Sequence, residues 1–131
     1  MTQRRAVLVV EDEPTLQTTL SAFLTLNEFA TFRASSVDEA LKILGREHID
    51  AVTLDIRLPD EQGMQRTGLT LLNFLRATPP YERLPVVIFT GVPLSPKDAQ
   101  HARRLNAEVI YKPQPFGVLL ASLARLMDPR R

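Results

Sequence analysis

The chain has 131 residues, a length that predicts one domain with a single core. Its 16 basic and 15 acidic residues give a formal net charge of +1, so no broad positive field favours direct contact with nucleic acid. The lack of cysteine excludes disulfides and thiolate metal sites, and the two histidines lie far apart in sequence, so any metal would be bound by oxygen. The first apolar run has five residues, too short for a signal-peptide core or a membrane span. We therefore expect a cytoplasmic chain without membrane contact.

Apolar runs and helical patterns alternate from the N-terminus onward. Residues 6–10 are typical of a buried strand, and Pro14 then opens a stretch in which leucines recur at helical spacing. A second strand around 30–34 precedes the capping-box sequence SVDE at 36–39, which begins a second helix that ends at Gly45. The first half of the chain therefore predicts two strand–helix units.

The second half of the chain repeats this alternation. Residues 51–55 predict a third strand, and a long loop separates it from a helix that begins at Gly68. The remaining predicted elements are a fourth strand over 86–90, a helix capped by Ser95, a fifth strand over 108–112 and a last helix over 116–126. Five strands alternating with five helices predict a doubly wound α/β fold, a five-stranded parallel sheet with helices on both faces.

Polar residues of the kind that phosphoryl transfer needs follow four of these strands. Glu11 and Asp12 follow the first strand and Asp55 ends the third, while Thr90 and Lys112 end the fourth and fifth. Because the carboxyl ends of parallel strands share one edge of a sheet, we expect these five side chains to form one pocket. Three carboxylates that close together are unfavourable without a cation, and Mg²⁺, which prefers oxygen ligands, is the natural candidate.

Each of these residues also has an ordinary structural explanation when taken alone. Glu11 and Asp12 could be solvated loop acids or acids favoured by a helix dipole, and Asp55 could bind backbone amides at the start of a loop. Lys112 could be a surface lysine, and Thr90 suits any strand end. An ionised aspartate can nevertheless attack phosphorus, and an ammonium on a neighbouring strand can pair with it or with phosphate oxygens. Their shared position after buried strands favours the chemical explanation.

Four motifs carry a resemblance to a known family: VLVVEDEP at 7–14, LDIRLP at 54–59, FTG at 89–91 and YKPQPF at 111–116. The chain resembles the receiver domain of a two-component response regulator over residues 5–127. The resemblance implies a flavodoxin-like strand order of 2-1-3-4-5 and a single receiver domain over 1–131, with short basic tails and no room for an output domain.

The resemblance also implies a role for each residue of the pocket. Asp55 corresponds to the phosphoacceptor, and Glu11 and Asp12 to the acid pair that binds Mg²⁺, with Glu11 contacting the metal directly or through water. The backbone carbonyl of Arg57 corresponds to a further metal ligand. Lys112 corresponds to the lysine that contacts the phosphoryl group, and its bond to the following proline corresponds to one that is cis in many receivers.

The signalling residues depart from the family pattern. Thr90 corresponds to the switch hydroxyl, but Val109 occupies the usual place of the aromatic switch residue. Tyr111, two positions further along the strand, projects from the same face and is the alternative carrier of that role. Arg57 and Val92 border the expected path of the hydrolytic water, which predicts a slowly hydrolysed phosphoryl group.

The loop after Pro59 is lengthened by about five residues around Gly63, the position of a family glycine. This loop could cover the phosphate or meet a partner, and a tolerated surface insertion is the simpler explanation.

The resemblance implies a phosphoryl donor that is a histidine kinase or a phosphotransfer protein. A downstream protein would contact the face formed by the fourth helix, fifth strand and fifth helix, and a homodimer is compatible with the same family. Such a domain catalyses its own aspartyl phosphorylation and dephosphorylation and is not a turnover enzyme. The competing hypothesis is a receiver-like interaction module that works without phosphorylation. A phosphohydrolase with an aspartyl nucleophile is disfavoured, because Arg57 stands where its second acid is usual.

Overall fold

The computed structural model describes residues 4–59 and 65–128, and five parallel strands form one sheet within them. The strand order is β2-β1-β3-β6-β7, the predicted order 2-1-3-4-5 once the strands of this sheet alone are counted. The strands are β1 (Ala6–Val10), β2 (Ala30–Ala34), β3 (Ala51–Leu54), β6 (Val86–Thr90) and β7 (Ala107–Tyr111). The third and fifth strands end one residue earlier than predicted, so Asp55 and Lys112 lie directly after their strands.

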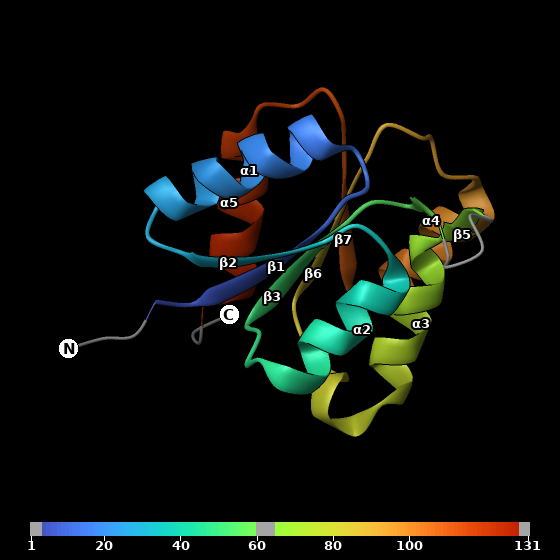
Figure 1. Cartoon of the computed structure of the whole chain (residues 1–131). Coiled ribbons are helices and arrows are strands. Elements are labelled where there is room, and N and C mark those ends of the chain that lie inside the picture. Colours follow the sequence, from blue (N-terminus) through green and yellow to red (C-terminus); the bar gives the residue numbers. More distant parts are fainter. Residues whose placement is uncertain (1–3, 60–64, 129–131) are drawn as a thin grey trace.

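Helices cover both faces of the sheet, as predicted (Figure 1). In Figure 1, α1 and α5 lie on one face, and α2, α3 and α4 lie on the other. The helices are α1 (Pro14–Leu26), α2 (Val37–Arg46), α3 (Gly68–Ala77), α4 (Pro96–Arg104) and α5 (Phe116–Leu126), and a 3₁₀ turn (Pro79–Tyr81) follows α3. In the described part of the chain, no helix is long and apolar enough to cross a membrane.

The core has two layers because each strand contributes alternate side chains to opposite faces of the sheet. Val7 and Val9 of β1 pack with Leu20 and Leu24 of α1, on the face that α5 also covers. Leu8 and Val10 of β1 pack on the other face, in the layer that α2 and α3 complete. The central strands β1, β3 and β6 are buried throughout, which explains their nearly continuous apolar sequences.

A small hairpin stands where the sequence predicted only a loop. Strand β4 (Arg57–Pro59) pairs antiparallel with β5 (Gln65–Thr67), and Arg57 lies opposite Thr67. Neither three-residue strand carries an alternating apolar pattern, so local sequence gave no strand signal. The lengthening around Gly63 falls outside the described residues, whereas the predicted helix start at Gly68 is confirmed.

Side-chain caps begin α1 and α4, two of the helices that start at the carboxyl edge of the sheet. Ser95 caps α4 by accepting the N–H of Asp98 at 3.1 Å, as its position before Pro96 predicted. Glu13 caps α1 by accepting the N–H groups of Thr15 and Leu16 at 3.2 and 2.6 Å. This cap places the start of α1 directly beside the acidic end of β1.

Candidate functional site

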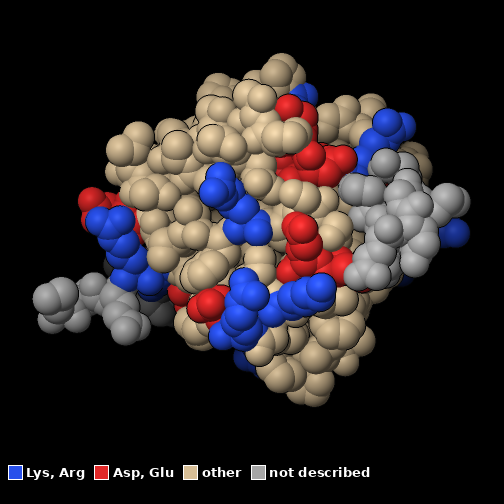
Figure 2. All heavy atoms as spheres, in the orientation of Figure 1, with Lys and Arg blue, Asp and Glu red and all other residues tan. Residues whose placement is uncertain are grey.

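The carboxyl ends of β1, β3 and β7 bring four of the five predicted side chains to one cavity, whereas the fully buried Thr90 does not line it. This cavity has a volume of about 540 Å³, and Glu11, Asp12, Asp55, Arg57 and Lys112 are among its lining residues. Asp55 and Glu11 are buried, whereas Asp12 is exposed at the rim. Figure 2 shows acidic side chains gathered near the N-terminal end of α1, on the side of the molecule where the cavity lies.

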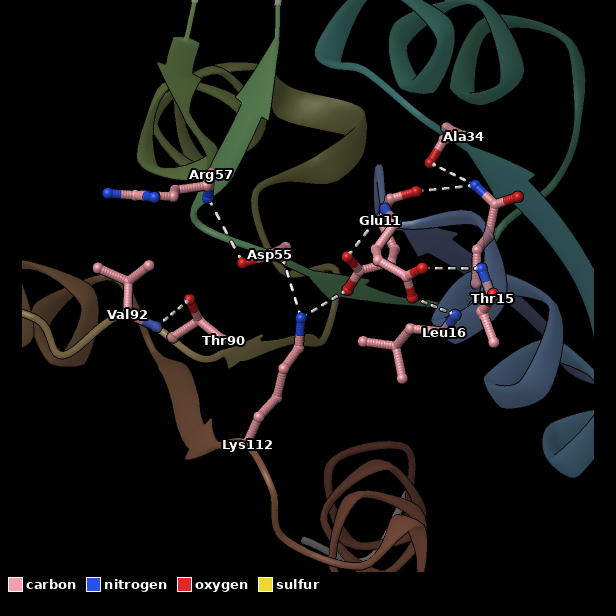
Figure 3. A network of polar contacts seen from close by, with 11 residues as sticks. Glu11, Thr15, Leu16, Ala34, Asp55, Arg57, Thr90, Val92 and Lys112 are labelled. Carbon is pink, nitrogen blue, oxygen red and sulfur yellow. Dashed lines mark hydrogen bonds and ion pairs between the residues drawn. The ribbon is translucent and has the colours of Figure 1, made fainter.

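Lys112 joins the two buried carboxylates. Its Nζ donates to Glu11 Oε1 at 2.9 Å and to Asp55 Oδ2 at 3.1 Å (Figure 3). The ammonium also lies 5.7 Å from the centre of the Phe89 ring, within cation–π range. Burial by itself would lower the pKa of Lys112, but its hydrogen bond to Glu11 and the negative charges of Asp55 and Glu11 together raise this pKa. Lys112 therefore stays charged and compensates the acids around it.

Glu11 titrates near neutral pH in this environment. Burial is the main cause that raises its pKa from 4.5 to about 7, and the charge of Asp55 raises it further. The hydrogen bond from Lys112 acts in the opposite direction without cancelling the effect of burial. The second carboxylate oxygen of Glu11 accepts the N–H of Glu13 at 3.3 Å. The site consequently contains a carboxyl group whose charge depends on whether a cation is close.

The donor set fits a hard divalent cation. One carboxylate oxygen from each of Glu11, Asp12 and Asp55 lies within 4.8 Å of the others, close enough to ligate one ion. Oxygen-only donors with an exposed side suit Mg²⁺, which keeps several waters and usually takes one or two protein carboxylates. The acid cluster of this chain matches that chemistry.

Arg57 contacts the site through its backbone. Its N–H donates to Asp55 Oδ1 at 3.4 Å, while its side chain is exposed and lines the cavity. Figure 3 shows the guanidinium pointing away from the carboxylate of Asp55. The proposed role of the Arg57 carbonyl as a metal ligand stays a prediction.

Thr90 is fully buried at the end of β6, and its Oγ1 accepts the N–H of Val92 at 3.2 Å. Val92 lines the cavity and is half-buried, and Gly91 leaves space beside the Lys112 side chain. The threonine hydroxyl therefore sits at the junction between the pocket and the loop that leads to α4.

Val109 and Tyr111 lie on the same face of β7, as their spacing predicted. Val109 is half-buried and packs against the core layer that includes Ile88 and Ala102. Tyr111 is 41% exposed, and its hydroxyl oxygen accepts the N–H of Leu94 at 3.4 Å. The peptide bond after Lys112 is cis, in agreement with the resemblance.

Three residues that position the site were not assigned to the pocket from the sequence. Glu13 caps α1, and its place immediately before a proline at the first helical position was the available signal. Gln17 Nε2 donates to the backbone carbonyl of Glu11 at 2.8 Å and to that of Ala34 at 3.2 Å, so it joins the ends of β1 and β2. Gly68 lies so close to Asp55 that an added Cβ would sit 2.1 Å from the Asp55 carbonyl oxygen.

Comparison with known proteins agrees with this fold. Residues 7–124 match the family described as the response regulator receiver domain, and the chain belongs to this family. It is 31% identical over 119 residues to the response regulator protein FleR of Pseudomonas aeruginosa and 30% identical over 129 residues to PilR of the same organism. These matches cover 91% and 96% of the chain but only 24% and 27% of FleR and PilR, so the chain spans about a quarter of their length.

A solved structure shows the same fold. The CheY-like receiver domain protein from Methanospirillum hungatei JF-1 superimposes with a TM-score of 0.84, covering 95% of this chain and 94% of that protein at 21% identity. At that identity the likeness concerns the fold alone.

Proposed function

We propose that this receiver domain accepts a phosphoryl group on Asp55 from a phosphohistidine and relays the signal through a change in conformation. The observation that carries the proposal is the position of Lys112, which bonds both Glu11 and Asp55 beside the exposed Asp12. A buried aspartate with an ammonium on one side and a cation site on the other is suited to phosphoryl transfer, in which positioning and charge supply most of the catalysis.

The transfer step follows from this geometry. A carboxylate oxygen of Asp55 attacks phosphorus in line, and the P–N bond of the donor breaks as the histidine nitrogen takes back the electron pair. Lys112 can then exchange its bond to Asp55 Oδ2 for the phosphoryl oxygens, because an ammonium pairs with either anion. Glu11, Asp12 and Asp55, with the Arg57 carbonyl, would hold Mg²⁺, which neutralises charge on the phosphoryl oxygens when it is bound.

The Thr90 hydroxyl is the element that would respond. It can donate to a phosphoryl oxygen on Asp55, and the loop after β6 would follow this movement because the Val92 amide is bonded to the same hydroxyl oxygen. Response regulators act with histidine kinases and downstream partners, and we place the downstream contact of this chain on the face of α4, β7 and α5. Receiver domains are generally not turnover enzymes, and we expect the same of this chain. We expect it to act in the cytoplasm, where the kinase domain holds its phosphohistidine.

Incubation with acetyl phosphate and Mg²⁺ tests the proposal. We expect wild-type protein to gain one phosphoryl group by intact-mass analysis, and chelation of Mg²⁺ to abolish the gain. Asp55→Asn is the matched control because it preserves size and removes the nucleophilic charge. Wild-type protein that stays unmodified, or an adduct that survives in Asp55→Asn, would contradict phosphorylation at Asp55, and the first result would favour the interaction module.

A further inference from the structure

A second polar cavity lies at the amino edge of the sheet, opposite the edge that carries Asp55. It has a volume of about 230 Å³, and Arg76, Glu82, Arg83 and Asn106 are among its lining residues. Arg76 belongs to the last turn of α3, and Arg83 lies between the turn after α3 and β6. Asn106 comes directly before β7. The cavity therefore collects polar side chains from three connections at the end of the fold that the Asp55 pocket does not use.

The Arg76 guanidinium is the half-buried charge of this cavity. Its Nε donates to the Leu105 carbonyl at 2.7 Å, and its Nη1 donates to the carbonyls of Tyr81 and Leu84 at 3.2 and 2.8 Å. All three acceptors are neutral, and no carboxylate of the described residues pairs with Arg76. The Nη2 atom keeps two N–H groups for a further acceptor.

These contacts leave most of the charge of Arg76 without compensation. Leu105 is the C-cap of α4, so its carbonyl belongs to the negative end of the helix dipole, which amounts to only about half an elementary charge. Burial lowers the pKa of the Arg76 guanidinium, the direction expected for a cation that has no acid beside it. An anion at the remaining N–H groups would supply the missing charge.

The neighbouring side chains favour an anion as well. Arg83 and Asn106 are exposed, and their side chains bond to no other residue within 4–59 and 65–128, so both can turn a donor toward a ligand. Glu82 is an exposed acid at the same cavity and likewise has no bonded partner among those residues. Two arginines against one glutamate leave the lining with a positive charge.

We propose that this cavity binds a small oxyanion of the phosphate type, held by Arg76 and Arg83 with the Asn106 side chain as a further donor. A guanidinium presents paired N–H groups that match the oxygens of such an ion. The volume of about 230 Å³ lies below the roughly 300–1,000 Å³ of pockets for drug-sized ligands, which favours an ion over a nucleotide. The site needs neither Asp55 nor Mg²⁺, so it stands independently of the proposed function.

An anion at this place would act on the connections around α3 and α4. Arg76 already joins the end of α3 to the turn that follows it, to the residue before Pro85 and to the C-cap of α4. A ligand that binds only the folded chain raises the free energy of unfolding. The bound ion would therefore strengthen the attachment of these segments to the amino edge of the sheet.

A titration with inorganic phosphate tests the site. We would add phosphate to the full chain in the presence of EDTA, with chloride holding the ionic strength constant, and follow the Arg76 Nε–H and the Asn106 side-chain amide by NMR. We expect saturable shifts of both signals, with sulfate acting like phosphate and acetate binding more weakly. Shifts that follow ionic strength alone would overturn the site, and stronger saturation by acetate than by phosphate would overturn the assignment to a phosphate-type ion.

Charge variants at the rim make the test specific. Arg83→Gln should weaken phosphate binding about threefold to tenfold, because it removes one charged donor at an exposed position. Glu82→Gln should tighten binding about twofold to fivefold, because it removes a like charge. Arg33→Gln is the matched control, since Arg33 is an exposed arginine on β2, the strand at the opposite side of the sheet from β7.

Two further outcomes would contradict the proposal. Equal phosphate affinity in wild type, Arg83→Gln and Arg33→Gln would show that no ion binds at this cavity. Asp55→Asn should bind phosphate like wild type, and a changed affinity in that variant would place the ion in the Asp55 pocket. Arg76→Gln should abolish saturation, and its circular dichroism spectrum would separate a lost ligand from a lost fold, while Arg83→Gln and Glu82→Gln keep the proposal testable if that variant unfolds.

Discussion

At the scale of single residues, the three acids of the pocket differ in burial and in their contact with Lys112. Glu11 and Asp55 are buried and share Lys112, whereas Asp12 is exposed. One ammonium does not offset the burial of two carboxylates: burial is the main cause that raises the pKa of Glu11, and the charge of Asp55 raises it further. A second cation would favour the ionised form of Glu11, which is the electrostatic argument for the proposed metal at this site.

The Glu11 pKa predicts a pH-dependent stability. The carboxyl has a pKa of about 7 in the folded chain against 4.5 for the ordinary group, so the folded state binds more protons between these values. The free energy of unfolding should therefore fall as pH rises from about 5 to about 7, by roughly 1–3 kcal/mol. Lys112 does not titrate in this window, because its pKa is raised above 10.5.

Urea denaturation at a series of pH values measures this effect. Glu11→Gln, which cannot ionise, should flatten the dependence relative to wild type. Mg²⁺ should restore stability at pH 8, because it binds the ionised acids of the folded state. The same slope in Glu11→Gln and in wild type would show that other groups cause it.

Arg57 supports a second prediction at this scale. Its exposed side chain and the half-buried Val92 line the cavity in which a hydrolytic water would approach phosphorylated Asp55. We expect a long-lived phosphoadduct, and Arg57→Asn should shorten its lifetime severalfold after the donor is removed. Arg33→Asn, at an exposed position on the edge strand β2, is the matched control. A longer lifetime in Arg57→Asn would contradict the prediction.

At the scale of elements, the β4–β5 hairpin and the start of α3 lie against Asp55, the proposed phosphoacceptor. The Gly68 N–H donates to the Ile56 carbonyl at 2.5 Å, and a Cβ added at Gly68 would lie 2.1 Å from the Asp55 carbonyl oxygen. The hairpin therefore begins two residues after Asp55, and its second strand ends beside Gly68, which lies against the Asp55 backbone. Local sequence identified the start of α3 at Gly68, but the reason for a glycine there is a contact with a residue thirteen positions earlier, as the numbering shows.

Gly68→Ala should damage both folding and phosphorylation. The added methyl would meet the Asp55 backbone, which no side-chain rotation can relieve, so we expect a loss of about 1–3 kcal/mol in unfolding free energy. Gly45→Ala is the matched control, because no atom lies within 4 Å of its added Cβ in α2. That change should stabilise the chain by about 0.5–1 kcal/mol. Equal stability of the two variants would show that α3 can shift without cost.

At the scale of the whole molecule, one sheet with two covered faces makes the pocket and the core interdependent. The strands that carry Glu11, Asp55 and Thr90 are the central and most buried ones.

The outer surface is uneven in charge. Figure 2 shows an uncharged area over α1, whose thirteen residues include no Lys, Arg, Asp or Glu.

This architecture predicts a single cooperative unfolding transition. We propose that residues 1–131 form one domain, so circular dichroism and the fluorescence of Tyr81 and Tyr111 should report the same urea midpoint. The two tyrosines lie on separate parts of the fold, one in the turn after α3 and one on β7. Two distinct midpoints would contradict a single domain.

The sequence by itself determined the order of elements and the edge at which the chemistry gathers. Apolar runs and helical patterns are local, and parallel strands bring their carboxyl ends together wherever they occur, so Asp55 and Lys112 could be paired from the sequence alone. Only the tertiary structure decided the features that depend on the distances between remote segments and on the burial of their side chains. Those features are the Lys112 bridge to Glu11, the pKa that burial gives Glu11, the hairpin beside Asp55, and the Tyr111 contact with Leu94.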